Sequence, residues 1–369
     1  MKWIIALAVL VTTFAAGSVY IFLDADVAYR NPVDASTTGA SSVSSKAINN
    51  SVGSELPTAK TIPGLAWVGQ TFNNCSSVAL FIVLSRWDIK DTQEKIAEAT
   101  RPWNNPRGDN DDKSVTLYEL ADYARTRHGL LAYVRPAGNI ELLKKFIAAD
   151  IPVLTRALTY RDDDIVHYRV IRGYNESQQV VIESDGIEGQ NQLYSYKDWM
   201  HFWKDFNYSY LIVVPKEKKQ IVESILGEEA NEQWAWRNAK ARAEDEVARN
   251  SSDMRAKYNI VTALFYLGDY EGTAREFEKI ESSLTRRKLW YQMEPIEAYF
   301  KLGKFDRVIE LADSVINDNN KSVSELYVLK GKVYESRGQT AEARAEYEIA
   351  IYYNKNLQSA KDALAQLGT

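Results

Sequence analysis

The chain has 369 residues, of which 45% are hydrophobic and 26% charged, a balance that is ordinary for globular domains. This length allows two or three domains, each large enough to bury a core. The net charge of -5 excludes the strongly basic surface that nucleic-acid binding requires. We therefore expect no nucleic-acid partner.

An uncharged stretch runs from Trp3 to Leu23, directly after Met1 and Lys2. At about 1.5 Å per residue, a helix over this stretch spans the roughly 30 Å hydrocarbon layer of a bilayer. The apolar run continues past the small residues at 15–17, which favours an uncleaved anchor over a signal peptide. We predict a transmembrane helix within residues 1–30, with the rest of the chain on the periplasmic side of a bacterial inner membrane. Secretion after signal-peptide cleavage is the alternative.

Two changes of composition divide the remaining chain. Residues 31–61 are rich in small polar side chains, which predicts a flexible linker. Residues 62–215 show helical periodicity first and strand-like segments later, which predicts an α+β domain with an antiparallel sheet. The expected helices are 78–87, 91–99, 116–127 and 140–149, and the expected strands are 130–134, 152–158, 167–174, 179–184 and 210–214. We expect Asp91 or Thr92 to cap the second of these helices and Asn139 to cap the fourth.

Strand signals vanish after residue 215, and a repeat replaces them. Gly268, Gly303 and Gly338 lie 35 residues apart, each between two amphipathic helical segments. This spacing is close to the tetratricopeptide period of about 34 residues, in which each repeat is a helix–turn–helix unit. We therefore predict an all-α tetratricopeptide-repeat solenoid over residues 216–369, which binds a protein partner.

Three details support the repeat. Gly331 and Ala343 occupy positions where small residues let the paired helices of this repeat pack closely. A helix over 233–248 is expected to precede the repeats, and a capping helix over 357–367 is expected to end them.

Cys75 is the single cysteine of the chain. It cannot form a disulfide within its own chain, and no CxxC pair exists to build a zinc site. Two roles remain, an inert buried residue or a nucleophile. An apolar helical segment follows it directly, and a helix N-terminus stabilises a thiolate.

A catalytic thiol needs a base, and the chain has three histidines. His128 lies at a polar helix end, where it can stabilise the helix C-terminus. His201 lies in an aromatic-rich helical segment. His167 opens a strand, which places it at the rim of a sheet. We therefore choose His167 as the candidate base, with a half-buried strand residue as the alternative.

Two further side chains complete a candidate site. Asp185 follows the next strand, and an antiparallel hairpin brings the end of that strand beside His167. Its alternative role is a simple turn residue. Gln70 lies five positions before Cys75, and its side-chain amide can donate to an oxyanion formed at the thiol.

The segments 70–75 and 167–174, followed by Asp185, resemble the bacteriocin-processing cysteine peptidases that cleave double-glycine leaders, which are papain-like enzymes. The resemblance covers about residues 62–215 and implies a papain-like peptidase domain. It departs from the family at Ser76 and Ser77, where a glycine usually follows the cysteine, and at Gly186, where proline is frequent. The roles that it implies are nucleophile for Cys75, base for His167, orienter of the base for Asp185 and part of the oxyanion hole for Gln70.

These observations predict a membrane-anchored, extracytoplasmic cysteine peptidase whose repeats recruit a peptide or protein substrate. A catalytically inactive peptide-binding module and a repeat-based scaffold are the alternatives. We expect no cofactor, since no glycine-rich phosphate loop precedes a helix. We also expect no metal, because the acidic run at 109–112 lacks the ligand spacing of a calcium loop.

Overall fold

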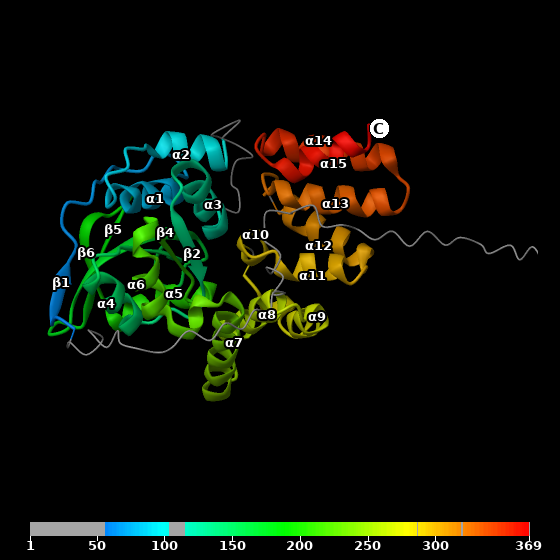
Figure 1. The fold of residues 1–369 in the computed structure, drawn as a ribbon. Coiled ribbons are helices and arrows are strands. Elements are labelled where there is room, and N and C mark those ends of the chain that lie inside the picture. Colours follow the sequence, from blue (N-terminus) through cyan, green and yellow to red (C-terminus); the bar gives the residue numbers. More distant parts are fainter. Residues whose placement is uncertain (1–55, 103–114, 286, 319, 369) are drawn as a thin grey trace, which may run out of the picture.

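The computed structural model describes residues 56–102, 115–285, 287–318 and 320–368. The predicted membrane anchor, most of the predicted linker and the acidic run at 109–112 lie outside these residues. No helix in the described part is long and apolar enough to cross a membrane. A sheet-containing part comes first and an all-helical part follows it, as the sequence predicts (Figure 1).

One antiparallel sheet organises the first part, with the strand order β2-β7-β3-β4-β5-β6 and with β1 paired to β4. In Figure 1, α1, α2 and α3 lie above the sheet, and α4, α5 and α6 lie below it. The strands are β1 (Ala59–Thr61), β2 (Leu131–Arg135), β3 (Val153–Leu158), β4 (Val166–Asn175), β5 (Val180–Asp185), β6 (Gly189–Ser195) and β7 (Tyr210–Val214). The helices are α1 (Cys75–Ser85), α2 (Gln93–Thr100), α3 (Leu117–His128), α4 (Ile140–Ala148), α5 (Tyr196–Trp203) and α6 (Lys219–Leu226).

Side-chain caps set the starts of several helices. The Thr92 hydroxyl accepts the backbone N–H of Lys95 at 3.2 Å and begins α2, so of the two predicted caps, Asp91 and Thr92, it is Thr92 that acts. Asn139 accepts the N–H of Leu142 at 2.9 Å and begins α4, as predicted. Each bond satisfies one of the backbone donors that a helix leaves unpaired at its first turn.

Two strands were not predicted. β1 lies inside the segment predicted as linker, so the linker prediction of 31–61 runs three residues into the sheet. Gly173 makes this pairing possible, because a Cβ there would lie 2.8 Å from the carbonyl oxygen of Lys60. β6 is polar, and it is held at the edge of the sheet by pairing with β5.

The second part consists of stacked helix pairs. Gly268, Gly303 and Gly338 occupy the turn of each pair, with φ angles of +83°, +69° and +72° that favour glycine. The predicted repeat is therefore present as three helix–turn–helix units. Its helices are α7 (Glu232–Arg249), α8 (Met254–Tyr266), α9 (Tyr270–Glu278), α10 (Lys288–Tyr291), α11 (Glu294–Lys301), α12 (Phe305–Asn317), α13 (Ser324–Ser336), α14 (Thr340–Tyr353) and α15 (Gln358–Gln366).

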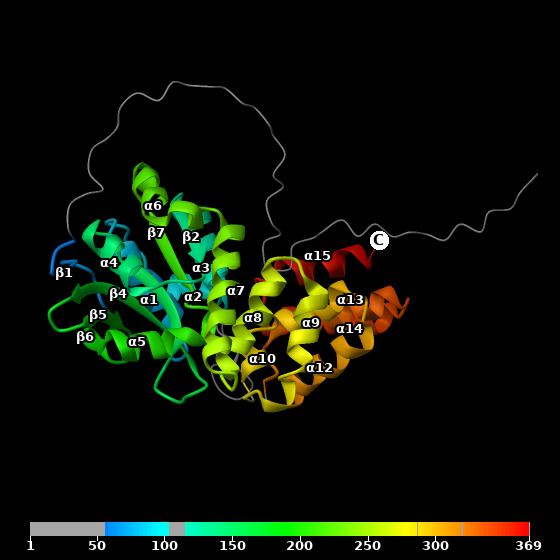
Figure 2. The same ribbon diagram turned by 90° about the horizontal axis from the view of Figure 1, so that it is seen from below.

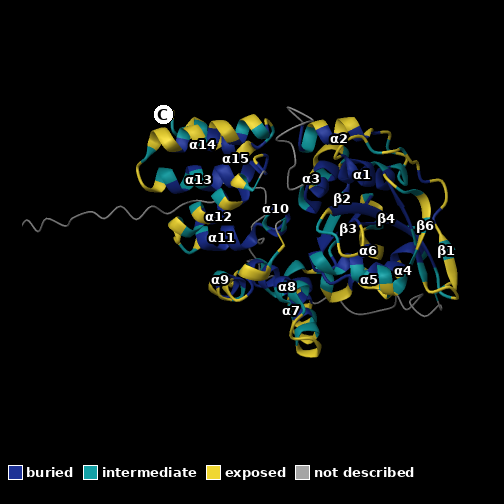
Figure 3. Cartoon of the chain, turned by 180° about the vertical axis from the view of Figure 1, so that it is seen from behind, coloured by how far each residue is buried: buried dark blue, intermediate teal, exposed yellow. Residues whose placement is uncertain are grey.

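The two parts share one hydrophobic core. A single cluster of buried side chains extends from Ile62 beside the sheet to Val333 in α13 (Figure 3). Figure 2 shows α7 between the sheet-containing part and the pair α8–α9. The last repeat has a smaller cluster of its own, centred on Tyr347 and Ala343. The helical part is therefore packed onto the first part rather than tethered to it.

Replacing Gly331 by alanine tests the close packing of the last repeat. The added Cβ would lie 2.4 Å from a ring carbon of Tyr347, which is fully buried. We expect Gly331→Ala to lower the free energy of unfolding by about 1–3 kcal/mol, measured by urea denaturation. Ser336→Ala, at the end of the same helix, serves as the control and should change it by about 0.5 kcal/mol or less. Equal stabilities for wild type and Gly331→Ala would contradict this packing.

Candidate functional site

A buried pair of His167 and Asp185 lies at the open end of the β4–β5 hairpin. His167 is the second residue of β4 and Asp185 is the last of β5, and their atoms Nε2 and Oδ2 are 2.9 Å apart. The other carboxylate oxygen accepts the backbone N–H groups of Ile187 and Glu188, both at 2.6 Å. The predicted approach of these two residues is present, although His167 is 2% exposed rather than half-buried. Because Asp185 engages Nε2, proton exchange with a thiol would use Nδ1.

Gln70 lies directly against the loop that follows Asp185. Its backbone N–H donates to the carbonyl of Gly186 at 2.9 Å, and the indole of Trp67 donates to the carbonyl of Asp185 at 2.5 Å. A Cβ at position 186 would lie 2.6 Å from the Cβ of Gln70, so glycine permits the approach. The departure from proline at this position thus has a steric reason.

Cys75 is the first residue of α1, where the partial positive charge of the helix N-terminus stabilises a thiolate. α1 packs against β4 and β5, which carry His167 and Asp185. Cys75 is 8% exposed, and Ser76 and Ser77 behind it are fully buried. The structure therefore seats the cysteine at the edge of the core, and a contact between its sulfur and the His167 ring stays a prediction.

The other two histidines have different partners. His128 lies 2.8 Å from a carboxylate oxygen of Asp91, at the end of α3 as expected. His201 lies 3.2 Å from the guanidinium of Arg255, and burial together with this charge lowers the pKa of His201. Among the three histidines, only His167 adjoins Asp185 in the described structure.

The sequence interpretation missed a buried ion pair beside the hydrogen-bonded pair of His167 and Asp185. Nε of Arg169 lies 3.3 Å from Asp185 and 3.7 Å from Glu183, and all three side chains are at most 1% exposed. The guanidinium also donates to the carbonyls of Leu158 and Thr159 at 2.8 and 2.7 Å. Strand alternation was the available signal, since Arg169 and Glu183 stand two residues from His167 and Asp185 and so share their face of the sheet.

Burial and these contacts set the charges of the site. Burial lowers the pKa of His167, although the hydrogen bond to Asp185 opposes it. Burial would raise the pKa of Asp185, but the hydrogen bonds with His167 and the N–H of Glu188, together with the charge of Arg169, lower it. Burial and the Asp185 charge raise the pKa of Glu183 to about 9. At neutral pH the site therefore holds a neutral His167, an ionised Asp185 and a protonated Glu183.

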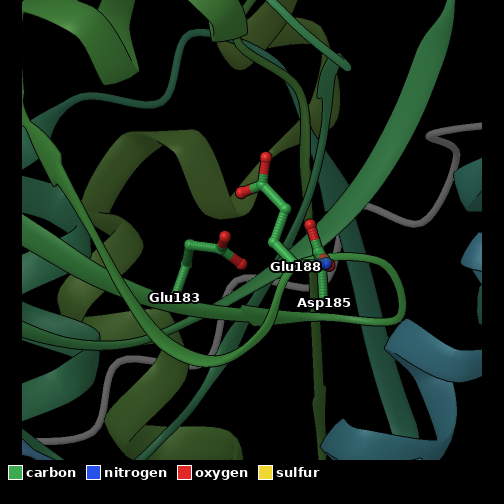
Figure 4. Close-up of side chains that lie close together, drawn as sticks. All are labelled: Glu183, Asp185 and Glu188. Atoms are coloured by element: carbon green, nitrogen blue, oxygen red, sulfur yellow. The ribbon is translucent and has the colours of Figure 1, made fainter. Parts of the chain in front are cut away.

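Three carboxyl groups converge at this point, namely Glu183, Asp185 and Glu188 (Figure 4). Their oxygen atoms lie within 4.8 Å of one another, which raises the question of a metal ion. However, Arg169 supplies a positive charge beside two of them, and the Tyr194 hydroxyl donates to the third. Because Asp185 is balanced by Arg169 and Glu183 keeps its proton, we assign no metal to this cluster.

Comparison with known proteins identifies the first part of the chain. Residues 59–213 match the family model described as the Peptidase_C39 like family. The sheet-containing part thus corresponds to a C39-like domain, and the stacked helix pairs follow it. Residues 59–213 are therefore similar to this peptidase family, and the resemblance seen in the sequence is confirmed. No curated protein matches the chain significantly.

Solved structures show weak similarity to each part. A protein provisionally assigned as a C39-like peptidase from Bacillus anthracis is 15% identical, with a TM-score of 0.35, and the match covers 43% of this chain and 98% of that one. A thermophilic tetratricopeptide-repeat protein from Thermus thermophilus is 17% identical, with a TM-score of 0.31, over 38% and 77% of the two chains. A tetratricopeptide-repeat protein from Parabacteroides merdae is 18% identical, with a TM-score of 0.31, over 42% and 65%.

Glu183→Gln tests the charge assignment. A carboxyl group whose pKa is raised to about 9 on folding is protonated in the folded chain and ionised in the unfolded chain between its two pKa values. The wild type should therefore lose stability as the pH rises through this window. The variant cannot titrate, so its stability relative to wild type should increase between about pH 5 and pH 9, by at most about 1.4 kcal/mol per pH unit.

Urea unfolding at several pH values measures this difference. The exposed Glu348→Gln is the matched control, and its stability relative to wild type should stay nearly flat over the same range. A flat difference for Glu183→Gln as well would mean that Glu183 is ionised in the folded protein.

Proposed function

We propose that the protein is a cysteine peptidase and that Cys75, His167, Asp185 and Gln70 carry the reaction. The buried hydrogen bond between His167 and Asp185 is the observation that carries this proposal, since it gives a histidine the carboxylate partner that orients a catalytic base. The helix α1, which begins at Cys75, packs against the two strands that carry this pair. The family match of residues 59–213 supports it.

The chemistry follows from these positions. His167 accepts the thiol proton at Nδ1, and the Cys75 sulfur attacks the peptide carbonyl. The negative charge that forms on the carbonyl oxygen is stabilised by the Gln70 side chain and the backbone N–H of Cys75. His167 returns the proton to the leaving amine, which leaves a thioester on Cys75. A water molecule, deprotonated by His167, hydrolyses the thioester, and His167 returns that proton to the Cys75 thiolate.

A peptide-binding module without turnover is the second candidate, and the burial of Cys75 at 8% exposure favours it. Thiol labelling separates the two candidates. A thiolate activated by His167 reacts quickly with iodoacetamide at neutral pH, whereas an inert core thiol reacts slowly. Since the chain has a single cysteine, any label that is incorporated reports on this position alone.

Location and substrate supply are further parts of the proposal. An anchor within residues 1–30 would hold the described parts outside the cytoplasm, on the periplasmic side of the inner membrane. The repeats would bind a protein and raise the effective concentration of its scissile segment at the site. The apolar stretch from Trp3 to Leu23 and the stacked helix pairs support these two statements.

Replacing the nucleophile tests the peptidase proposal. Cys75→Ser keeps the shape of the side chain but lacks its nucleophilicity, so peptide hydrolysis should fall by about six orders of magnitude. Cys75→Ala should have the same effect and cost about 1–2 kcal/mol of stability, because the thiol is buried. Hydrolysis is measured with a quenched fluorescent peptide, and stability by thermal unfolding. Hydrolysis that survives both substitutions would exclude Cys75 as the nucleophile.

Surface substitutions test whether the repeats recruit a substrate. Deleting the repeats would not be a suitable test, because they share a hydrophobic core with the first part. Ile349 and Tyr352 expose 38% and 61% of their area on α14. We expect Ile349→Ser with Tyr352→Ser to lower kcat/KM for a protein substrate about tenfold and to leave a short peptide unaffected. Ile221→Ser, exposed on α6, is the control. Equal effects on the protein and the peptide would argue against recruitment at this surface.

A further inference from the structure

The helix α2 connects the loop before Cys75 to the helical repeats. Its first residue, Gln93, is 5% exposed and touches this loop. The residue after its last turn, Arg101, is 4% exposed and touches α13. The eight residues of α2 form a helix about 12 Å long that separates these two contacts.

At the first end, the Gln93 side chain holds both peptide groups that flank Gln70. Its Nε2 donates to the carbonyl of Gly69 at 2.9 Å, and its Oε1 accepts the backbone N–H of Thr71 at 2.9 Å and the Thr71 hydroxyl at 3.2 Å. All of the amide's contacts thus fall on one loop, and this loop carries the proposed oxyanion donor.

The same loop continues to the nucleophile. Thr71 accepts two bonds from Asn74, one from its backbone N–H at 3.1 Å and one from its side-chain amide at 2.6 Å. Asn74 is the N-cap of α1, and Cys75 follows it. A shift of Gln93 would therefore move Gln70 and Cys75 together.

At the other end, the repeats hold α2 through polar contacts, of which those of Arg101 are buried. Arg101 lies 2.8 Å from Oε1 of Glu325 and 3.2 Å from the hydroxyl of Ser324, both in the first turn of α13. Asn356, before α15, donates to the carbonyls of Glu98 and Ala99 at 2.7 and 3.1 Å. Glu119 in α3 also lies 3.2 Å from Arg101, so two carboxylates balance the buried guanidinium, and the one from α13 joins the end of α2 to the repeats.

We propose that Gln93 is a positioning residue for Gln70 and Cys75. We also propose that the repeats fix the position of Gln93 through their contacts with the C-terminal end of α2. This inference rests on the proposed roles of Gln70 and Cys75. It gives the repeats an effect on the chemical step that is separate from substrate recruitment. A partner that displaces α13 would alter the reactivity of the thiol.

Iodoacetamide labelling of Cys75 in the full chain tests the inference without requiring turnover. Gln93→Met keeps the length of the side chain and loses the three hydrogen bonds. Glu325→Gln neutralises the one carboxylate partner of Arg101 that comes from the repeats. Gln358→Met is the matched control for the first, because Gln358 is also the first residue of its helix. Glu346→Gln is the control for the second, because it breaks a mostly buried pair with Lys330 inside the repeats.

We expect Gln93→Met to change the labelling rate on the order of tenfold, with a displaced pH midpoint, and Glu325→Gln to change it in the same direction. Backbone hydrogen exchange should rise at residues 69–75 in both variants and stay unchanged in both controls. With a cleavable peptide, kcat should fall while KM stays nearly constant, since both side chains are buried and act through the position of Gln70 and Cys75. Gln93→Asn, which is one methylene shorter, replaces Gln93→Met if the latter does not fold.

Three results would overturn parts of the inference. If Gln93→Met has the labelling rate and the hydrogen-exchange rates of the wild type, the positioning role is overturned. A change in that variant without one in Glu325→Gln would overturn the link to the repeats. A rise in exchange throughout the chain would assign both residues to general stability. A wild type that hydrolyses no peptide, with the labelling differences intact, would end the peptidase proposal and leave this inference standing.

Discussion

The arrangement of the candidate site depends on one buried positive charge, the guanidinium of Arg169. Two carboxyl groups, Asp185 and Glu183, lie beside it with almost no exposure to water. An ionised carboxylate without a partner would be too costly to bury there. Arg169 stabilises the charge on Asp185, and Glu183 avoids the same cost by keeping its proton, as its raised pKa indicates. The orientation of His167 by Asp185 follows from this division of charge.

The helical repeats are also fixed to the rest of the chain by packing and by polar contacts. The sheet, the helices that cover it and the repeats share a continuous core, while polar contacts at α2 join the loop before Cys75 to α13. A binding module that only concentrates a substrate would need neither feature, because a flexible tether is sufficient for that purpose. The interface agrees with the proposed connection between the repeats and the site.

Much of the fold could be predicted because its signals are local. The caps at Thr92 and Asn139 and the glycines of the repeat each act within one turn of helix or one tight turn. The pairing of His167 with Asp185 was also accessible, since hairpin geometry brings the end of one strand beside the start of its neighbour. The strand β6 was not accessible in this way, because its polar residues have low strand preference and pairing with β5 decides their conformation.

The candidate site was predicted less completely than the fold. Arg169, Glu183 and Gln93 act through contacts between segments that lie far apart in the sequence, or through burial that composition does not reveal. Cys75 is also more buried than a helix start suggests, and His167 is more buried than a strand start suggests. Periodicity identifies which face a residue occupies, but neighbours from other elements decide how much water reaches it.

The shared core also bears on how such a chain could arise and be rearranged. Modules joined by exposed linkers can be exchanged by recombination, since each keeps its own core when it is cut free. A break between the sheet and the repeats of this chain would instead expose apolar side chains on both new surfaces. The two parts would therefore have been inherited together once their interface formed, and a change on one side would favour compensating changes on the other.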